Sequence, residues 1–230
     1  VKIVNLAEKL GTSQSTVRRD INELADQGKL RKVFGGAVAL ASRIKTVDED
    51  TTVKAFIQVQ EKKTVAKYAA SMIEDYDFVF IDAGTTTENM VEFLDNYTVT
   101  YVTNSISTGY AMAHRGFKVY IPCGQIKKIT NSVNGIEAVN FIRNFNFSKC
   151  FIGVNGIDKE RGYTSTDFDE VQIKREAMMH SNQCYVLADS SKFGSISSAT
   201  IAQVGDAFII TDELPDPEYH ELTQIKVLEE

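Results

Sequence analysis

The chain has 230 residues, of which 43% are hydrophobic, and its formal net charge is −6. This length allows one large core with a small appended unit, so we expect two domains of unequal size. No apolar stretch approaches the roughly 20 residues that span a bilayer, and no signal peptide is visible, so no membrane association is expected.

The charge is divided unevenly along the sequence. Residues 1–45 contain nine Lys or Arg and four Asp or Glu, a balance of +5, which leaves −11 for the remaining residues. A basic head on an acidic body is typical of a DNA-binding domain fused to a sensor domain.

The cysteines and histidines indicate neither disulfides nor a metal. Cys123, Cys150 and Cys184 are odd in number, and two of them lie in apolar runs. We therefore expect buried, reduced thiols and a cytoplasmic protein. The histidines are scattered, without Cys or carboxylate residues at ligand spacing, so no metal site is predicted.

Residues 3–10 predict a short helix, because their apolar side chains recur at helical spacing. Gly11 ends this helix and Ser13 is a good N-cap for a second one, which is the pattern of a helix-turn-helix. In the second helix Val17, Ile21 and Leu24 line one face. The polar side chains of the opposite face can therefore enter a major groove of DNA.

DNA contact is assigned to polar side chains at the start of the second helix and to basic side chains that follow. Ser, Thr and Gln suit base edges and phosphates, and Arg reaches phosphates or guanine. Basic and apolar residues then alternate around Gly35-Gly36, which predicts a hairpin wing. A solvated basic helix followed by an ordinary hairpin is the alternative. The candidate DNA-binding residues are Ser13, Gln14, Ser15, Thr16, Arg18, Arg19, Arg31 and Lys32.

Residues 1–40 thus form the predicted DNA-binding domain, and the polar residues 41–56 predict a linker. Over residues 57–230, apolar runs alternate with helical patterns. This alternation predicts an α/β domain with a mainly parallel sheet flanked by helices on both faces. The predicted strands are 78–82, 99–103, 118–122, 150–154, 184–188 and 207–211, and the predicted helices are 62–74, 86–95, 105–115, 134–144 and 169–182.

Several predicted strands run into small, polar loops, and ligands of such sheets bind beyond the carboxyl ends of the strands. In Asp82-Ala-Gly-Thr-Thr-Thr87, Gly84 lets the backbone approach an anion and the threonine hydroxyls can donate to it. Together the loops can surround one phosphorylated polyol, whereas each loop alone can equally serve as a turn or a helix cap. The other loops are 103–105, 123–125 with Lys127 and Lys128 behind it, 153–156 and 189–192.

These motifs resemble the DeoR-type bacterial transcriptional regulators, over nearly the whole chain. The resemblance implies a winged helix-turn-helix joined to a domain similar in fold to ribose-5-phosphate isomerase and glucosamine-6-phosphate deaminase. The motifs of the head are Ser15-Thr-Val-Arg-Arg-Asp-Ile21 and Gly28-Lys-Leu-Arg-Lys-Val-Phe-Gly-Gly-Ala37; those of the body are Asp82-Ala-Gly-Thr-Thr86, Thr103-Asn-Ser105, Ser132 with Gly135, Phe151-Ile-Gly153, Lys174-Arg175, Asp189-Ser-Ser-Lys-Phe-Gly194 and Thr211-Asp212.

The resemblance implies that residues 84–87 hold a sugar phosphate, that Lys174 and Lys192 assist, and that Asp82 and Asp189 face the sugar. The full candidate effector set is Asp82, Gly84, Thr85, Thr86, Thr87, Thr103, Asn104, Ser105, Gly124, Lys127, Ser132, Gly153, Lys174, Asp189 and Lys192.

The chain departs from the family pattern in two places. The family commonly has Gly-Gly followed by arginine where this chain has Cys123-Gly124 and Lys127, and a lysine cannot make arginine's bidentate contact. Family members usually have a further helix before the position of Val1. Because that helix is missing here, we expect residues 1–38 to be truncated and loosely packed.

The patterns predict a DNA-binding transcriptional regulator, a repressor of a carbohydrate-use operon controlled by a phosphorylated sugar. It would need no cofactor and no catalytic residue, and would bind double-stranded operator DNA as a homo-oligomer, a dimer or a tetramer. The sequence patterns are consistent both with a ligand that releases the protein from DNA and with a ligand that promotes DNA binding. The alternatives are a sugar-phosphate isomerase or deaminase, with Asp82, Asp169, Glu170 and Asp189 as acid or base groups, and a purely structural oligomerisation module.

Overall fold

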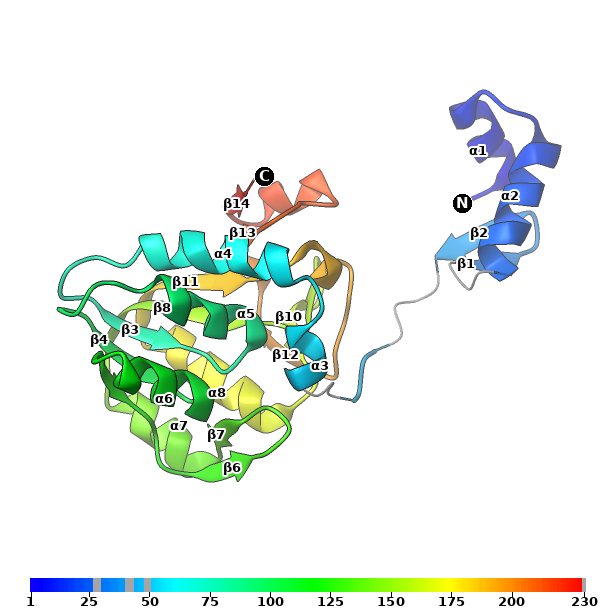
Figure 1. Ribbon diagram of the computed structural model, residues 1–230. Helices are drawn as coiled ribbons and strands as arrows, with labels where there is room; N and C mark the ends of the chain where they lie inside the picture. Colours follow the sequence, from blue (N-terminus) through cyan, green and yellow to red (C-terminus); the bar gives the residue numbers. More distant parts are fainter. Residues whose placement is uncertain (27–29, 40–43, 48–50, 229–230) are drawn as a thin grey trace. The chain divides into compact units, whose positions relative to one another are not determined.

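The computed structural model describes residues 1–26, 30–39, 44–47 and 51–228. The chain divides into two units, Val1–Arg43 and Ile44–Glu230, here called the head and the body (Figure 1). Each unit has a hydrophobic core of its own.

The head is a helix-turn-helix followed by a hairpin, as predicted. Helix α1 (Ile3–Leu10) ends at Gly11 in the left-handed conformation, with φ 62°. Helix α2 (Gln14–Asp26) begins after Ser13, whose Oγ accepts a hydrogen bond from the Thr16 N–H at 3.1 Å. Strands β1 (Leu30–Val33) and β2 (Gly36–Ala39) pair antiparallel across a turn at Gly35.

The core of the head is small. It consists of Ala7, Val17, Ile21 and Ala37, with further side chains packed partly buried against it. Leu24, expected on the same apolar face, is not part of this core and is 37% exposed. Loose packing of residues 1–38 stays a prediction.

The body is built on a seven-stranded sheet in which every strand pair is parallel, in the order β14-β13-β11-β8-β3-β4-β5. All the strands predicted from apolar runs are present in it. Strand β14 was not predicted, because its three residues are too short to form an apolar run. The bounds are β3 (Phe78–Ile81), β4 (Thr100–Thr103), β5 (Lys118–Tyr120), β8 (Phe147–Gly153), β11 (Ser181–Leu187), β13 (Phe208–Thr211) and β14 (Ile225–Val227).

Helices cover both faces of the sheet, as Figure 1 shows. Along β3, Phe80 packs in one core cluster while Val79 and Ile81 pack in the other, because successive side chains of a strand point to opposite faces. One face is covered by α4 (Val59–Ser71), α5 (Thr85–Glu88), the 3-10 helix η1 (Asn89–Phe93) and α6 (Ile106–His114); the other is covered by α7 (Ile136–Arg143) and α8 (Phe168–Met179).

Two helix predictions are corrected by the structure. The single helix predicted over 86–95 is the short α5 followed by the 3-10 helix η1, which ends at Phe93. The helix predicted over 169–182 ends at Met179, because Ser181 already pairs with Phe147 in the sheet.

None of the helices within the described ranges combines the length and the apolar character that crossing a membrane requires.

Several smaller elements lie outside the central sheet and were not predicted. The helix α3 (Thr51–Ala55) lies inside the predicted linker 41–56, whose residues 41–43 and 48–50 fall outside the described part. The other elements are the hairpin β6 (Gln125–Lys127) with β7 (Ser132–Asn134), the antiparallel sheet of β9 (Gly156–Asp158), β10 (Gly162–Ser165) and β12 (Ala199–Ala202), and the 3-10 helices η2 (Ser190–Lys192), η3 (Val204–Asp206) and η4 (Pro217–Glu221).

Candidate effector site and DNA-binding face

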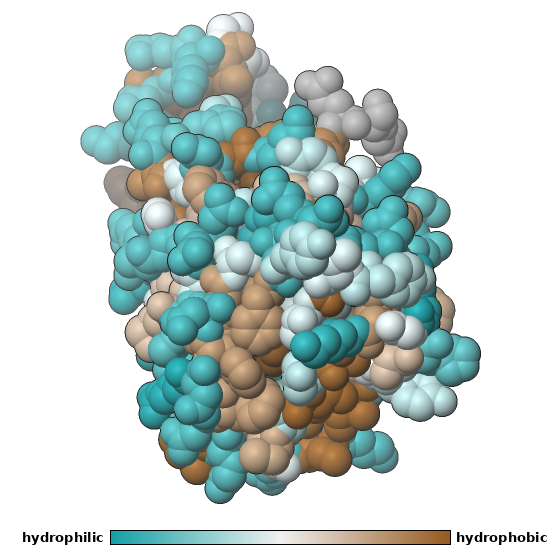
Figure 2. All heavy atoms as spheres, turned by 90° about the vertical axis from the view of Figure 1, so that its left-hand side faces the viewer, coloured by the Kyte–Doolittle hydropathy of each residue, from teal (hydrophilic) through white to brown (hydrophobic). Residues whose placement is uncertain are grey.

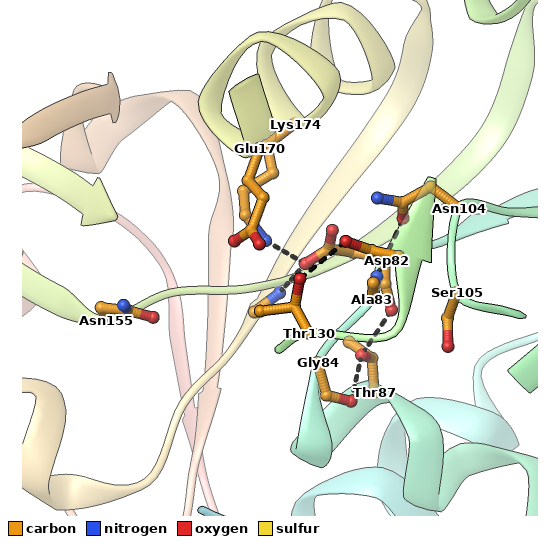
Figure 3. Close-up of polar contacts among 12 residues, drawn as sticks. Asp82, Ala83, Gly84, Thr87, Asn104, Ser105, Thr130, Asn155, Glu170 and Lys174 are labelled. Carbon is orange, nitrogen blue, oxygen red and sulfur yellow. Dashed lines mark hydrogen bonds and ion pairs between the residues drawn. The ribbon is translucent and has the colours of Figure 1, made fainter. Parts of the chain in front are cut away.

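Asp82 is the centre of the candidate effector site. It directly follows β3 and is 1% exposed. Its Oδ2 accepts a hydrogen bond from the Gly153 N–H at 3.1 Å and pairs with the Lys174 Nζ. Figure 3 shows Lys174 reaching down from α8 to this carboxylate. Three candidate residues from distant parts of the sequence are therefore in direct contact.

The loop after Asp82 is held by its own threonine. Thr87 Oγ1 donates to the Asp82 carbonyl at 2.7 Å and is 2.9 Å from the Gly84 carbonyl (Figure 3). The hydroxyl of Thr87 is thus engaged inside the loop, which is the capping role considered for this motif. Thr86 is buried and Thr85 is partly exposed.

The loop after β4 is fastened to the loop after β3. Asn104 Oδ1 accepts a hydrogen bond from the Ala83 N–H at 2.9 Å. Thr103 Oγ1 accepts from the Ser105 N–H, and Ser105 Oγ caps α6 by accepting from the Thr108 N–H at 3.2 Å. These side chains are buried, so they fix the geometry of the site before any ligand arrives.

Lys127 joins the β6–β7 hairpin to α8. Its Nζ lies 2.9 Å from Glu170 Oε1 and 3.1 Å from Asp167 Oδ2. Glu170 is 7% exposed and projects from the same helix as Lys174, on the same side (Figure 3). The lysine that stands where the family commonly has arginine therefore neutralises acidic groups of the protein itself.

The hairpin also brings small polar groups to the site. Ser132 Oγ is 2.8 Å from Thr130 Oγ1 and accepts from Asn134 Nδ2 at 3.0 Å. Asn134 Oδ1 is buried without a hydrogen-bond partner among the described residues. At Gly124, where φ is 150°, a Cβ atom would lie 2.5 Å from the Asn134 carbonyl oxygen, so a larger residue does not fit.

Asp189 follows β11 and is completely buried. Its Oδ1 accepts from the Ser191 N–H at 3.1 Å, whereas its Oδ2 has no hydrogen-bond partner among the described residues. Lys192 Nζ lies 3.3 Å from that Oδ2, and its side chain is 25% exposed. Lys192 is thus a cation at the surface of the site with a buried carboxylate beneath it.

Sequence reasoning missed Lys62, a lysine of α4 that is only 3% exposed. Its Nζ donates to the Lys54 carbonyl. Burial lowers the pKa of Lys62, and the nearby charge of Asp189 acts in the opposite direction. The signal was its spacing from Val65 and Ala66, which places Lys62 on the apolar stripe of the helix.

The carboxylates considered for acid or base chemistry differ in their burial and in their ion-pair partners. Asp82 is paired with Lys174, Glu170 is paired with Lys127, and Asp169 is exposed. Within the described ranges, no cluster of three or more His, Cys, Asp or Glu side chains is arranged to hold a metal ion.

In the head, the candidate DNA-binding side chains of α2 lie on its exposed face. Ser13 Oγ is 2.7 Å from Ser15 Oγ and 2.9 Å from Thr16 Oγ1. Gln14 and Arg18 are exposed, and Arg19 is 80% exposed with its Nε 3.9 Å from Asp20.

The wing is tied to α2 by one of its own lysines. Lys32 Nζ donates to Asn22 Oδ1 at 3.2 Å. Arg31 lies in β1 opposite Val38, and its side chain falls outside the described part. The hairpin therefore presents its lysine on the α2 side.

Comparison with known families agrees with both units. Residues 57–213 match the DeoR C terminal sensor domain, and residues 1–43 match the DeoR-like helix-turn-helix domain. The chain therefore belongs to the DeoR family and is a DNA-binding transcriptional regulator.

Its relatives are named as regulators. The chain is 37% identical to the "Uncharacterized HTH-type transcriptional regulator FruR" of Bacillus subtilis, over 99% of this chain and 92% of the relative. It is 31% identical to the lactose phosphotransferase system repressor of Staphylococcus aureus, over 95% of this chain and 87% of the relative. Among solved structures, ribose 5 phosphate isomerase A from Neisseria gonorrhoeae aligns with a TM-score of 0.43 and 16% identity, over 58% of this chain and 53% of that one.

Proposed function

We propose that this regulator represses a carbohydrate-use operon and that a phosphorylated sugar binds at the carboxyl ends of β3, β4, β8 and β11. The observation that carries the proposal is the direct contact of Asp82 with Gly153 and Lys174, beside Asn104. Ligands of parallel sheets bind at this edge. The name of the lactose phosphotransferase system repressor supports control of sugar use.

The site offers complementary groups to such a ligand. Buried carboxylate and amide groups suit sugar hydroxyls, because they are held in place by the protein before binding. Lys192 is the partly exposed cation that would neutralise the phosphate. The residues of the candidate set thus divide into a sugar-facing group around Asp82 and a phosphate-facing group that includes Lys192. The proposal requires no cofactor.

We further infer a homo-oligomer, a dimer or a tetramer, acting on operator DNA in the cytoplasm. Pairing of bodies would place heads on repeated half-sites. Figure 2 shows apolar side chains gathered on one face of the molecule. Large exposed apolar residues of the body occur around the edge strand β5, and exposed surface of this kind favours association. They include Tyr110, Tyr120, Ile121, Ile126 and Ile136.

Thermal shift across a panel of hexose, pentose and triose phosphates tests the effector proposal. A ligand that binds the folded state raises the melting temperature, and at a hundred times its Kd it adds about 2.7 kcal/mol to the free energy of unfolding. The unphosphorylated sugars serve as controls and should give a much smaller shift. The proposal fails if no sugar phosphate stabilises the protein, and turnover of a bound sugar phosphate would point to the isomerase or deaminase instead.

Arg19→Ala tests the DNA-binding face. Because Arg19 is exposed on α2, its removal should weaken operator binding and, if it contacts a phosphate, reduce the log–log salt slope by about 1. Fluorescence anisotropy over a range of salt concentrations measures both quantities. Unchanged affinity and slope would place Arg19 away from the DNA.

A further inference from the structure

The residues that follow the head in the sequence are attached to the body by hydrogen bonds. We call residues 44–47 and 51–57 the connecting segment. The Lys45 N–H donates to the Ile196 carbonyl at 2.8 Å, and the Ser198 N–H donates to the Lys45 carbonyl at 3.1 Å. Thr51 donates to the Ile129 carbonyl through its N–H at 3.2 Å and through its Oγ1 at 3.1 Å.

Both of these attachments lie next to candidate effector residues. Ile196 and Ser198 belong to the loop that begins with Lys192. Ile129 lies in the turn between Lys127 and Ser132. The loops that would contact a ligand are therefore the loops that hold the connecting segment.

Lys62 makes a third attachment. Its Nζ donates to the carbonyl of Lys54 in α3, and α3 and α4 both pack against α5, which begins at Thr85. Lys62 is buried, and Asp189 and Lys192 are close enough to affect its pKa. A buried ammonium has three donors and is better satisfied by an anion than by a neutral carbonyl.

The joint between α3 and α4 has an unusual backbone. Gln58, just before α4, has φ 53° and ψ 48°, in the left-handed region. This conformation is uncommon for a residue other than glycine and persists only where neighbouring contacts enforce it. The Lys62–Lys54 bond is a contact that spans this joint, so its loss would free α3 to move relative to α4.

We propose that the phosphate of the effector and the Lys54 carbonyl compete for the Lys62 ammonium. When the phosphate takes the ammonium, α3 loses its bond to α4 and the connecting segment loosens. Ligand binding is thereby passed to the residues that lead to the head. This inference rests on the proposed binding of a sugar phosphate at the site.

Hydrogen exchange of the full chain tests the inference through two amides. The Thr51 N–H bonds to Ile129, and the Ile57 N–H bonds to the same Lys54 carbonyl that Lys62 uses. The probe is the sugar phosphate that gives the largest thermal shift, with inorganic phosphate as the minimal anion. Exchange at both amides should rise about tenfold on binding, the change expected from the loss of one charge-assisted hydrogen bond, while residues 84–87 become protected.

Lys62→Met removes the charge and keeps most of the packing volume. Without ligand, this variant should already exchange rapidly at Thr51 and Ile57, should show no further rise with the probe, and should bind it about tenfold more weakly or worse. Lys67→Met is the matched control, because Lys67 is exposed on the same helix, and it should behave as the wild type.

The outcomes separate the two proposals. Protection of residues 84–87 without faster exchange at Thr51 and Ile57 overturns the role of Lys62 and leaves the effector site standing. If Lys62→Met binds the probe with wild-type affinity and shows wild-type exchange, the role of Lys62 is likewise overturned and the effector site stands. If no sugar phosphate protects residues 84–87, the effector site and the role of Lys62 fail together. Should Lys62→Met not fold, the wild-type exchange measurement decides.

Discussion

Asp82→Ala is expected to lower the free energy of unfolding by about 3–5 kcal/mol, because it leaves the buried ammonium of Lys174 without its partner. The Gly153 N–H loses its acceptor at the same time. Chemical denaturation followed by circular dichroism measures this loss. Asp169→Ala is the matched control, since Asp169 is exposed, and it should change stability by about 1 kcal/mol or less.

The double variant Asp82→Ala with Lys174→Met identifies the cause. Removing both charges takes away the uncompensated ammonium, so the double variant should be more stable than Asp82→Ala alone. It should nevertheless fail to bind the sugar phosphate, because both groups belong to the proposed site. If the two single losses simply add, Asp82 and Lys174 do not act as a pair.

Lys192→Ala should weaken binding of the sugar phosphate about 10- to 100-fold, the value of a hydrogen bond to a charged group. Lys192 is the partly exposed cation beside Asp189, so its loss removes one positive charge that would contact the phosphate. Operator affinity in the absence of ligand should stay unchanged, because Lys192 lies outside residues 1–43, which match the helix-turn-helix domain.

Calorimetric titration with the sugar phosphate and anisotropy with operator DNA measure the two affinities. Lys67→Ala, which removes an exposed lysine of α4, should change neither. Loss of both affinities in Lys192→Ala would indicate misfolding. Unchanged sugar-phosphate affinity would move the phosphate away from Lys192.

The central sheet could be predicted from the sequence because its strands are continuous apolar runs. Phe78–Ile81 and Phe208–Thr211 are buried on both faces and stand out from their polar surroundings. The sheet of β9, β10 and β12 has no such signal. Gly162 and Thr164 of β10 belong to a mixed polar segment, and β12, which pairs with β10, lies far along the chain. Strands that pair across a long sequence separation and have a weak apolar pattern cannot be predicted from local periodicity.

The site was predictable as a set of loops but not as a set of contacts. The polar residues after the strands indicated which loops meet, because parallel strands end at one edge. No local pattern indicates that Lys174 pairs with Asp82, 92 residues away, or that Lys127 pairs with Glu170. Such pairings depend on the tilt and depth of α8, which local patterns do not determine.

The hydrogen bond from Ala83 to Asn104 has a consequence for the charge of the pocket. An aspartate would have the same shape and would accept the same bond, but it would place a second carboxylate beside the buried Asp82. Two neighbouring negative charges would repel each other and any incoming phosphate. The neutral amide of Asn104 therefore joins the two loops by a hydrogen bond without adding a negative charge that would repel an anionic ligand.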